Sequence, residues 1–293
     1  MKPQRKIGST GKGVTSLCAA LVVSGILLLP GKGVAQNFTI SNGGSTATLN
    51  LGDGSGGTGS IGMNSWTVGG VAQDQLDQQW FWYSIGNSAP QSIDNLGDLT
   101  TLYNGPNNLT VTYGAADGLQ VNVDYVLHGN GANSGSADMM EYIWIVNNSG
   151  SAINNFSFYQ YSNFNLLQNN LNSVTISGPA GAYTGAFQQT GVGGTGIAEV
   201  IVSPDANGAE AGLAAPTLSD VSTGTLNGNS SAGPGDVAWA FRWDDLTLAA
   251  NGGELDISKD KGLKVMTIPE PSTLALIALG IGALGLTLRR KLA

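Results

Sequence analysis

Apolar and polar residues alternate along much of the chain, which is the period of a β-strand with one buried face. In the segment 119–127 the odd-numbered positions carry Leu, Val or Tyr, whereas positions 120, 122 and 124 carry Gln, Asn and Asp. The segment 109–113 repeats the pattern, and a short glycine-bounded connection, 114–118, joins the two runs. This arrangement predicts a β-hairpin.

Other segments are apolar at consecutive positions, and three of them hold five of the six tryptophans: 79–83, 139–146 and 237–243. Such a strand is buried on both faces, so these segments predict a layered structure with one sheet beneath a second sheet or long loops. Weaker strand patterns fall at 46–51, 156–161, 173–176, 183–188, 198–203 and 254–259. Turn clusters rich in Gly, Asn and Ser separate nearly all of these segments.

The segment 36–266 contains no convincing amphipathic helix pattern and no repeat of fixed length. We therefore predict an all-β fold, a large antiparallel β-sandwich with more than ten strands. The alternative is two abutting sandwiches, with a break near 169–173 or 217–235.

The N-terminus has the organisation of a secretion signal, which must be set aside before the fold is considered. Basic residues precede an apolar run at 14–29, and Ala35 ends a small-residue cleavage site for signal peptidase. We predict a signal peptide at 1–35, with a signal helix, and a mature domain at 36–266. A retained membrane anchor is the alternative, and the shortness of the run disfavours it. Removal of the signal also removes Cys18, the only cysteine, so the mature chain can form no disulfide and no thiolate metal site.

The charge is distributed very unevenly along the chain. Between positions 36 and 271 four basic residues stand against all 20 acidic residues, a net charge of −16. Such a chain lacks the Lys and Arg needed to neutralise phosphates, which excludes nucleic acid as a partner. The acidity favours solubility, with cation binding as the alternative.

The C-terminal segment 267–293 carries three features in order. Pro269, Glu270 and Pro271 come first, an uncharged and mainly apolar run at 273–288 follows, and the chain then carries three basic residues: Arg289, Arg290 and Lys291. The run predicts a short transmembrane helix with a cytoplasmic basic stop. The prolines keep the segment around Glu270 extended and accessible to a processing enzyme.

This arrangement resembles the PEP-CTERM sorting signal of Gram-negative bacteria. The resemblance implies recognition of Pro-Glu-Pro by a membrane exosortase, an intermediate held in the inner membrane by its C-terminal helix, and delivery to the cell surface or an extracellular polysaccharide matrix. An ordinary tail anchor is the alternative.

The body resembles a recurring group of exported PEP-CTERM proteins. The resemblance rests on the segments 78–83, 158–164, 238–244 and 258–261. Similar proteins often carry Asp where this chain has Asn163 and Asn165, which weakens any metal site there. The resemblance implies secretion and no particular activity.

Catalytic residues are scarce. His128 is the only histidine, so a Ser-His-Asp triad and a zinc site have little support. The glycines at 52–57 match a dinucleotide fingerprint, but more loop follows where a helix is required. Paired carboxylates remain, with Asp124 and Glu141 on neighbouring strands, and Asp244 is expected to form an ion pair with Arg242 or with Lys259–Lys261.

Ligand-binding candidates are of two kinds. The oxygen-rich loops 94–98, 129–138 and 205–210 could hold one structural calcium, although none has an EF-hand spacing; we predict no other cofactor. Exposed aromatic rings on a flat sheet would stack on sugars, and four side chains are candidates for glycan contact: Trp80, Trp82, Tyr159 and Tyr161. Burial in the core is the alternative for these four, because 81 and 83 are also aromatic.

Taken together, these patterns predict an exported, non-enzymatic protein of the cell surface or extracellular matrix. The alternative is a carbohydrate-binding module for extracellular polysaccharide, and the third possibility is a glycoside hydrolase that uses a carboxylate pair.

Overall fold

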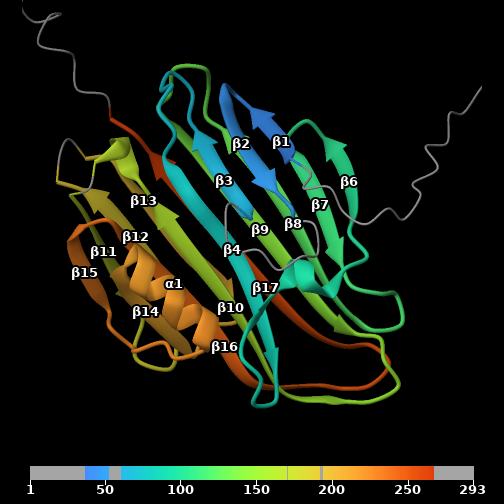
Figure 1. Ribbon diagram of the computed structural model, residues 1–293. Coiled ribbons are helices and arrows are strands. Elements are labelled where there is room, and N and C mark those ends of the chain that lie inside the picture. The colour runs from blue at the N-terminus through green and yellow to red at the C-terminus, as the bar shows by residue number, and fades with distance from the viewer. Residues whose placement is uncertain (1–36, 53–60, 170, 192–193, 267–293) are drawn as a thin grey trace, which may run out of the picture. The chain divides into compact units, whose positions relative to one another are not determined.

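The strands form two antiparallel sheets (Figure 1). The structure is a computed structural model and describes residues 37–52, 61–169, 171–191 and 194–266. The first sheet has eight strands in the order β1 (Asn37–Asn42), β2 (Ser45–Asn50), β3 (Gly62–Thr67), β4 (Leu76–Ile85), β10 (Ile153–Phe164), β16 (Val237–Leu248) and β14 (Gly208–Leu213), with β5 (Gln91–Ser92) paired to β4. The second has nine in the order β15 (Ser231–Gly235), β11 (Asn172–Ser177), β12 (Gly185–Thr190), β13 (Gly196–Ser203), β17 (Gly253–Lys264), β9 (Ser136–Asn147), β8 (Leu119–Gly129), β7 (Asn108–Tyr113) and β6 (Thr100–Gly105).

The prediction of an all-β sandwich with more than ten strands is confirmed. The predicted hairpin is formed by β7 and β8, with Val111 opposite Val123 and both side chains fully buried. Each of the six weaker strand patterns also overlaps a strand. Both breaks considered for a second sandwich fall inside this one pair of sheets, because β10 and β16, which lie on either side of them in sequence, are directly paired.

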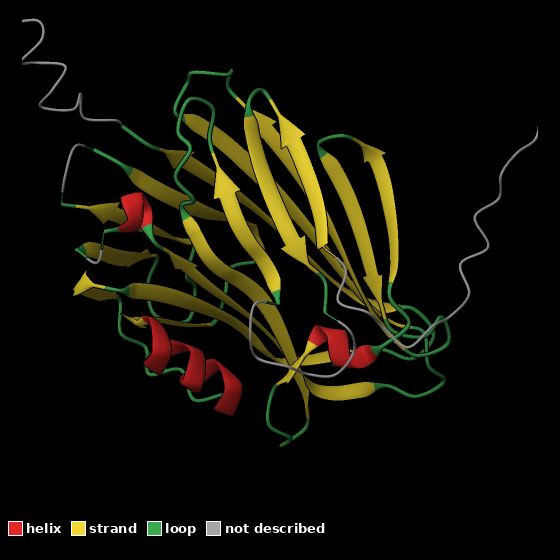
Figure 2. Ribbon diagram, turned by 45° about the horizontal axis from the view of Figure 1, so that its top comes forward, coloured by secondary structure: helices red, strands yellow, loops and turns green. Residues whose placement is uncertain are grey.

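Strands β4 and β16 are buried on both faces, as their continuous apolar runs predicted. One face packs against the nine-stranded sheet, since Trp239 of β16 donates a hydrogen bond to Glu199 of β13. On the other face, the helix α1 (Ala214–Thr223) covers part of the eight-stranded sheet and contacts β10, β14 and β16 (Figures 1 and 2). Two short 3-10 helices, η1 (Ile93–Leu96) and η2 (Leu166–Gln168), complete the described elements.

Helix α1 was not predicted from the sequence. It has ten residues, no side-chain cap at its N-terminus, and three buried positions, so its apolar stripe is too short to stand out in the chain. It ends at Gly224, whose φ of 76° is the left-handed conformation that closes many helices.

The expectation for β9 was wrong. Its apolar run predicted burial on both faces, but the strand alternates, and every second residue lies on an open face. Trp144 is 39% exposed, whereas Glu141 on the opposite face is fully buried. The apolar outer residues of β9 therefore mark a surface rather than a second core.

The predictions for the two ends of the chain concern residues outside the described ones. They are the signal peptide at 1–35 with cleavage after Ala35, and the tail at 267–293 with its helix. Among the described residues, no helix is both long enough and apolar enough to cross a membrane.

Candidate functional site

The four aromatic residues predicted to contact glycans lie in the protein core. They share one face of the eight-stranded sheet, because Trp82 is paired with Tyr159 and Trp80 with Tyr161. Each side chain is at most 5% exposed. The rings are thus arranged as the sequence suggested, but they cannot stack on a sugar in solution, and the alternative of burial in the core is the one that the structure supports.

Their cover consists of two segments that the sequence did not place there. The indole nitrogen of Trp80 donates to Ser92 Oγ at 2.6 Å, which ties the ring to the segment of β5 and η1. The hydroxyl of Tyr161 donates to the carbonyl of Ala214, the first residue of α1, at 3.1 Å. Burial raises the pKa of Tyr161 well above its ordinary value, with smaller contributions from Asp236 and Asp77.

The carboxylates proposed as an enzymatic pair do not face each other. Asp124 is opposite Tyr142 in the ladder of β8 and β9, and Tyr125 is opposite Glu141, so the two carboxylates project from opposite faces of the sheet. Asp244 instead pairs with Arg242 at 2.6 Å, the structural ion pair that was expected.

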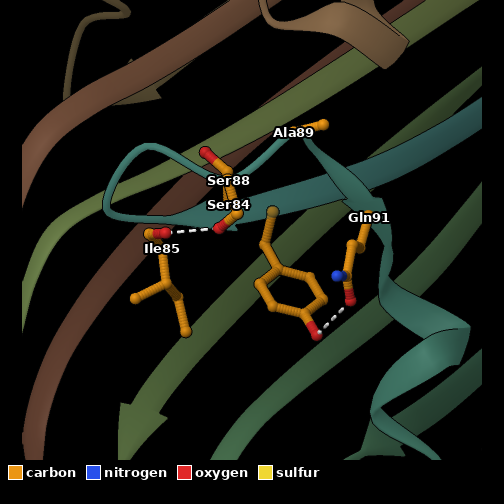
Figure 3. A pocket seen from close by; sticks show the side chains of 6 residues that line it. Ser84, Ile85, Ser88, Ala89 and Gln91 are labelled. Atoms are coloured by element: carbon orange, nitrogen blue, oxygen red, sulfur yellow. Dashed lines mark hydrogen bonds between the residues drawn. The ribbon is translucent and has the colours of Figure 1, made fainter.

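The loops suggested for calcium contain no described group of three or more His, Cys, Asp or Glu side chains that could hold a metal ion. A small cavity of about 110 Å³ lies instead beside the turn after β4 and is lined by six residues: Tyr83, Ser84, Ile85, Ser88, Ala89 and Gln91 (Figure 3). The Tyr83 hydroxyl donates to Gln91 Oε1 at 3.4 Å. The described residues that line the cavity include no carboxylate and no imidazole, and Tyr83 is the one titratable side chain among them.

A cluster of charged side chains is buried between the two sheets. Its members, here called the buried charge cluster, are Glu141, Glu199, Lys259, Lys261 and Gln160. Glu141 Oε2 lies 2.7 Å from the ammonium nitrogens of both lysines, and Glu199 Oε1 lies 3.4 Å from each of them. All four charged side chains are fully buried.

The eight-stranded sheet completes this cluster. Gln160 of β10 donates from Nε2 to both Glu199 oxygens at 2.7 and 2.8 Å and accepts a hydrogen bond from Lys259 Nζ at Oε1. Trp239 Nε1 donates to Glu199 Oε2 at 2.7 Å, and the Lys259 ammonium lies 4.8 Å from the centre of the Phe81 ring. The charges are therefore enclosed by protein on both sides.

The protonation equilibria in the cluster are strongly perturbed. Burial raises the pKa of Glu141, but attraction to Lys259 and Lys261 outweighs it and lowers that pKa to about 2. Burial lowers the pKa of Lys259, and repulsion from Lys261 adds to this effect although Glu141 opposes it. For Lys261 burial also acts downward, but attraction to Glu141 and Glu199 raises its pKa on balance. Lys259 is thus the lysine that gives up a proton more readily.

An open aromatic surface lies on the outer face of the nine-stranded sheet. Tyr142 and Trp144 of β9 are stacked side by side, with ring centroids 6.2 Å apart and planes 18° apart. We call these two residues the stacking pair. No described segment covers them, because alternate residues of β8, β9 and β17 are partly or fully exposed on this face.

Polar groups surround the stacking pair. Trp144 lies between Asn122 of β8 and Asp256 of β17, and Tyr142 lies between Asp124 and Ser258. Asp124 is held in place by Asn108 Nδ2 and Thr110 Oγ1, which both donate to its Oδ1 at 3.0 Å. No basic residue is paired with either aromatic ring, because Lys259 and Lys261 point into the core.

The sequence did contain a signal for both sites. In β17 the two lysines alternate with outward-facing residues in the same way as Ile257 and Leu263. Their side chains must therefore lie on the same, buried face of the strand. Glu141 likewise shares a face with Met139 and Ile143. Charged residues at apolar positions of two strands predict a buried ion-pair cluster, and Trp144, at the opposite parity, is then on the outside.

These features define a class of protein: a large two-layer antiparallel β domain with a charged core and an open aromatic face. A bacterial glucoamylase solved with acarbose has a TM-score of 0.51 with the chain at 11% identity, covering 85% of this chain and 36% of the glucoamylase. A galactose mutarotase-like protein from Lactobacillus casei ATCC 334 has a TM-score of 0.49 at 12% identity, covering 78% and 100%. At such identities the glucoamylase match supports the fold alone. No curated protein matches the sequence significantly.

The C-terminal segment gives the more specific identification. Residues 267–291 match the family model of the PEP-CTERM protein-sorting motif. The chain therefore carries this motif, which implies export and processing by an exosortase. The match confirms the sorting signal, which contains Pro269, Glu270, Pro271, Arg289, Arg290 and Lys291.

Proposed function

We propose that the protein is a non-enzymatic, polysaccharide-binding component of the cell surface or extracellular matrix, and that it binds through the stacking pair. The observation that carries the proposal is the stacking of Tyr142 and Trp144 on the outer face of the nine-stranded sheet, where Trp144 is 39% exposed and Tyr142 is partly exposed. Aromatic rings offer an apolar face of negative charge density, on which the C–H groups of a pyranose ring pack. An exposed aromatic patch rimmed by polar groups is typical of a binding surface.

The charge around the pair favours an uncharged polysaccharide over a polymer of uronic acids. Asp124 and Asp256 are paired with the rings and would repel an anionic chain, whereas Asn122 and Ser258 can exchange hydrogen bonds with hydroxyl groups.

Two observations support a non-enzymatic role. The carboxylates of the buried charge cluster are closed to solvent, so no polysaccharide can reach them. The cavity beside Gln91 is lined by no carboxylate, so it holds no carboxylate pair of the kind that a glycoside hydrolase uses.

The proposal is tested by affinity electrophoresis of the protein through gels that contain a neutral glucan, a xylan or a uronic-acid polymer. We expect a neutral polysaccharide to retard the wild type and Trp144→Ala to migrate as in a gel without polysaccharide. Phe187→Ala is the matched control, because Phe187 is another exposed aromatic of the same sheet, at 45%, and lies three strands away from β9. It should leave the retardation unchanged.

Two results would contradict the proposal. One is equal retardation of the wild type and Trp144→Ala, which would place any binding elsewhere. The other is a rise in reducing ends when the retarding polysaccharide is incubated with the protein, which would indicate hydrolysis.

A further inference from the structure

The buried charge cluster is costly as a purely structural feature. Removing ions from water is penalised by several kcal/mol each even when they are paired, and well-packed apolar residues would often stabilise a core better. The cluster cannot contact a polysaccharide bound at the stacking pair either, because its side chains are enclosed between the sheets. Its arrangement around Gln160 suggests a chemical role within the chain itself.

The contacts around Gln160 bring an amine, a carboxamide and a carboxylate together. Lys259 Nζ donates to the carboxamide oxygen of Gln160, so the amine lies beside the carbonyl group. Glu199 Oε1 accepts from the carboxamide nitrogen at 2.7 Å and lies 3.4 Å from Lys259 Nζ. One carboxylate thus touches both the nitrogen that could attack and the nitrogen that could leave.

We propose that Lys259 and Gln160 form an intramolecular amide bond, with Glu199 as the catalytic residue that transfers the proton. The bond would join β17 of the nine-stranded sheet to β10 of the eight-stranded sheet. It would be a covalent modification within one chain, independent of any glycan binding.

The reaction balances without an oxidant or a co-reactant. The Lys259 ammonium gives one proton to Glu141, 2.7 Å away, and becomes a neutral amine. Its nitrogen attacks Cδ of Gln160, forming the new C–N bond, while Glu199 takes a proton from the attacking nitrogen and gives one to Nε2. The bond between Cδ and Nε2 then breaks, ammonia leaves, and the proton held by Glu141 converts it to ammonium.

The surrounding charges suit this sequence. Burial lowers the pKa of Lys259, which favours the neutral, nucleophilic amine. The proton of Lys259 stays in the cluster on Glu141, so the net charge remains zero, and Lys261 keeps its charge beside Glu199. Trp239 fixes Glu199 through a hydrogen bond of 2.7 Å.

A covalent link at this position would stabilise the domain as a disulfide does in other exported proteins. The single cysteine of the chain is Cys18, so residues 36–266 can form no disulfide. Lys259 and Gln160 are 99 positions apart, and closing so long a loop strongly restricts the unfolded chain.

The test is peptide mapping of the folded protein purified from its native host. Chymotrypsin cleaves after Tyr159 and Tyr161, so Gln160–Tyr161 should be recovered attached to the peptide that contains Lys259, with the loss of one ammonia. Total mass alone does not decide the matter, because cyclisation of an N-terminal glutamine or at Asn–Gly sites releases ammonia as well. Gln188, which is also buried and donates from Nε2 to the carbonyl of Phe164, is the internal control and should remain unlinked.

Variants assign the roles. Lys259→Met should abolish the linked peptide, and Glu199→Gln should reduce its yield at least tenfold while circular dichroism confirms the β fold. The wild-type digest decides the proposal even if a variant fails to fold. Recovery of Gln160 in an unlinked peptide would overturn it, and so would a link from Lys259 to Glu141 with loss of water.

Discussion

For the charged side chains in the core, burial and attraction to neighbouring charges shift the pKa in opposite directions. Glu141 shows the largest resolved effect of this attraction. It is fully buried, yet its pKa is lowered to about 2 because attraction to two lysines exceeds the effect of burial. A carboxyl with a lowered pKa contributes stability above its unfolded pKa and loses that contribution as the pH falls toward the folded value. The relevant window therefore runs from the ordinary value of 4.5 down to about 2.

We expect Glu141→Gln to lower the free energy of unfolding by about 3–5 kcal/mol at neutral pH, because it leaves Lys261 with one fewer anion. The difference from the wild type should narrow as the pH falls through this window, since protonated Glu141 resembles glutamine. Urea denaturation at several pH values measures it. The prediction applies to the chain in which Lys259 is an unlinked ammonium, because the attraction that lowers the pKa of Glu141 comes from both lysines.

The control is Glu254→Gln, which changes an exposed residue of the same strand as Lys259 and Lys261. Its effect should stay within about 0.5 kcal/mol at every pH. A difference between Glu141→Gln and wild type that does not vary with pH would show that the carboxylate is not held ionised by the lysines.

At the scale of elements, the sequence predicted strands correctly where the apolar residues occupy one face of the strand regularly or fill both faces. The alternation in 119–127 was sufficient for β8, and the continuous apolar runs of β4 and β16 correctly indicated two covered faces. The same reasoning was wrong for β9. Its apolar residues Met140, Tyr142 and Trp144 suggested that this face is buried, but no described segment lies over it.

The candidate sites were less predictable, for a physical reason. Burial of Glu141 depends on Lys259 and Lys261, which are more than 100 residues away in sequence; local periodicity shows that each of them is on a buried face but not which residues pair with one another. The cover over Trp80 and Tyr161 similarly comes from η1 and α1, whose short segments have weak patterns of their own.

Helix α1 provides a prediction of its own through Gly224. Gly224→Ala should destabilise the domain by about 1–2 kcal/mol from the left-handed backbone alone. The added methyl group would also lie 3.2 Å from Tyr159 Oη and 3.3 Å from Pro90 Cγ, which makes the loss larger. Thermal denaturation measures the change.

Gly181→Ala is the matched control, because Gly181 has a φ of 85° and no atom lies within 4 Å of the added methyl. This variant should lower the stability of the domain by less than Gly224→Ala does. Equal losses would mean that α1 is not fixed by packing at its C-terminal end.

At the scale of the whole molecule, charge and sorting act together. Four basic residues stand against 20 acidic ones between positions 36 and 271, and the two lysines and two glutamates of the buried charge cluster cancel, so the net charge of −16 falls on the other residues of this segment. Such a charge opposes association with anionic lipids and nucleic acids and keeps an exported domain soluble. The PEP-CTERM motif implies that the chain is held at the membrane during sorting through its C-terminal segment.

The sorting motif leads to the last prediction. Replacing Pro269, Glu270 and Pro271 with alanine removes the sequence that the exosortase is expected to recognise, while the apolar run and its basic stop remain. We expect the wild type to be trimmed near Ala35 and Pro271 and found outside the cell, and the variant to stay with the membrane fraction at a mass that includes the tail. Intact mass and fractionation of the native host measure both. If both forms keep the tail and remain with the membrane, the segment acts as a permanent anchor, and the polysaccharide should be sought at that membrane rather than in the matrix.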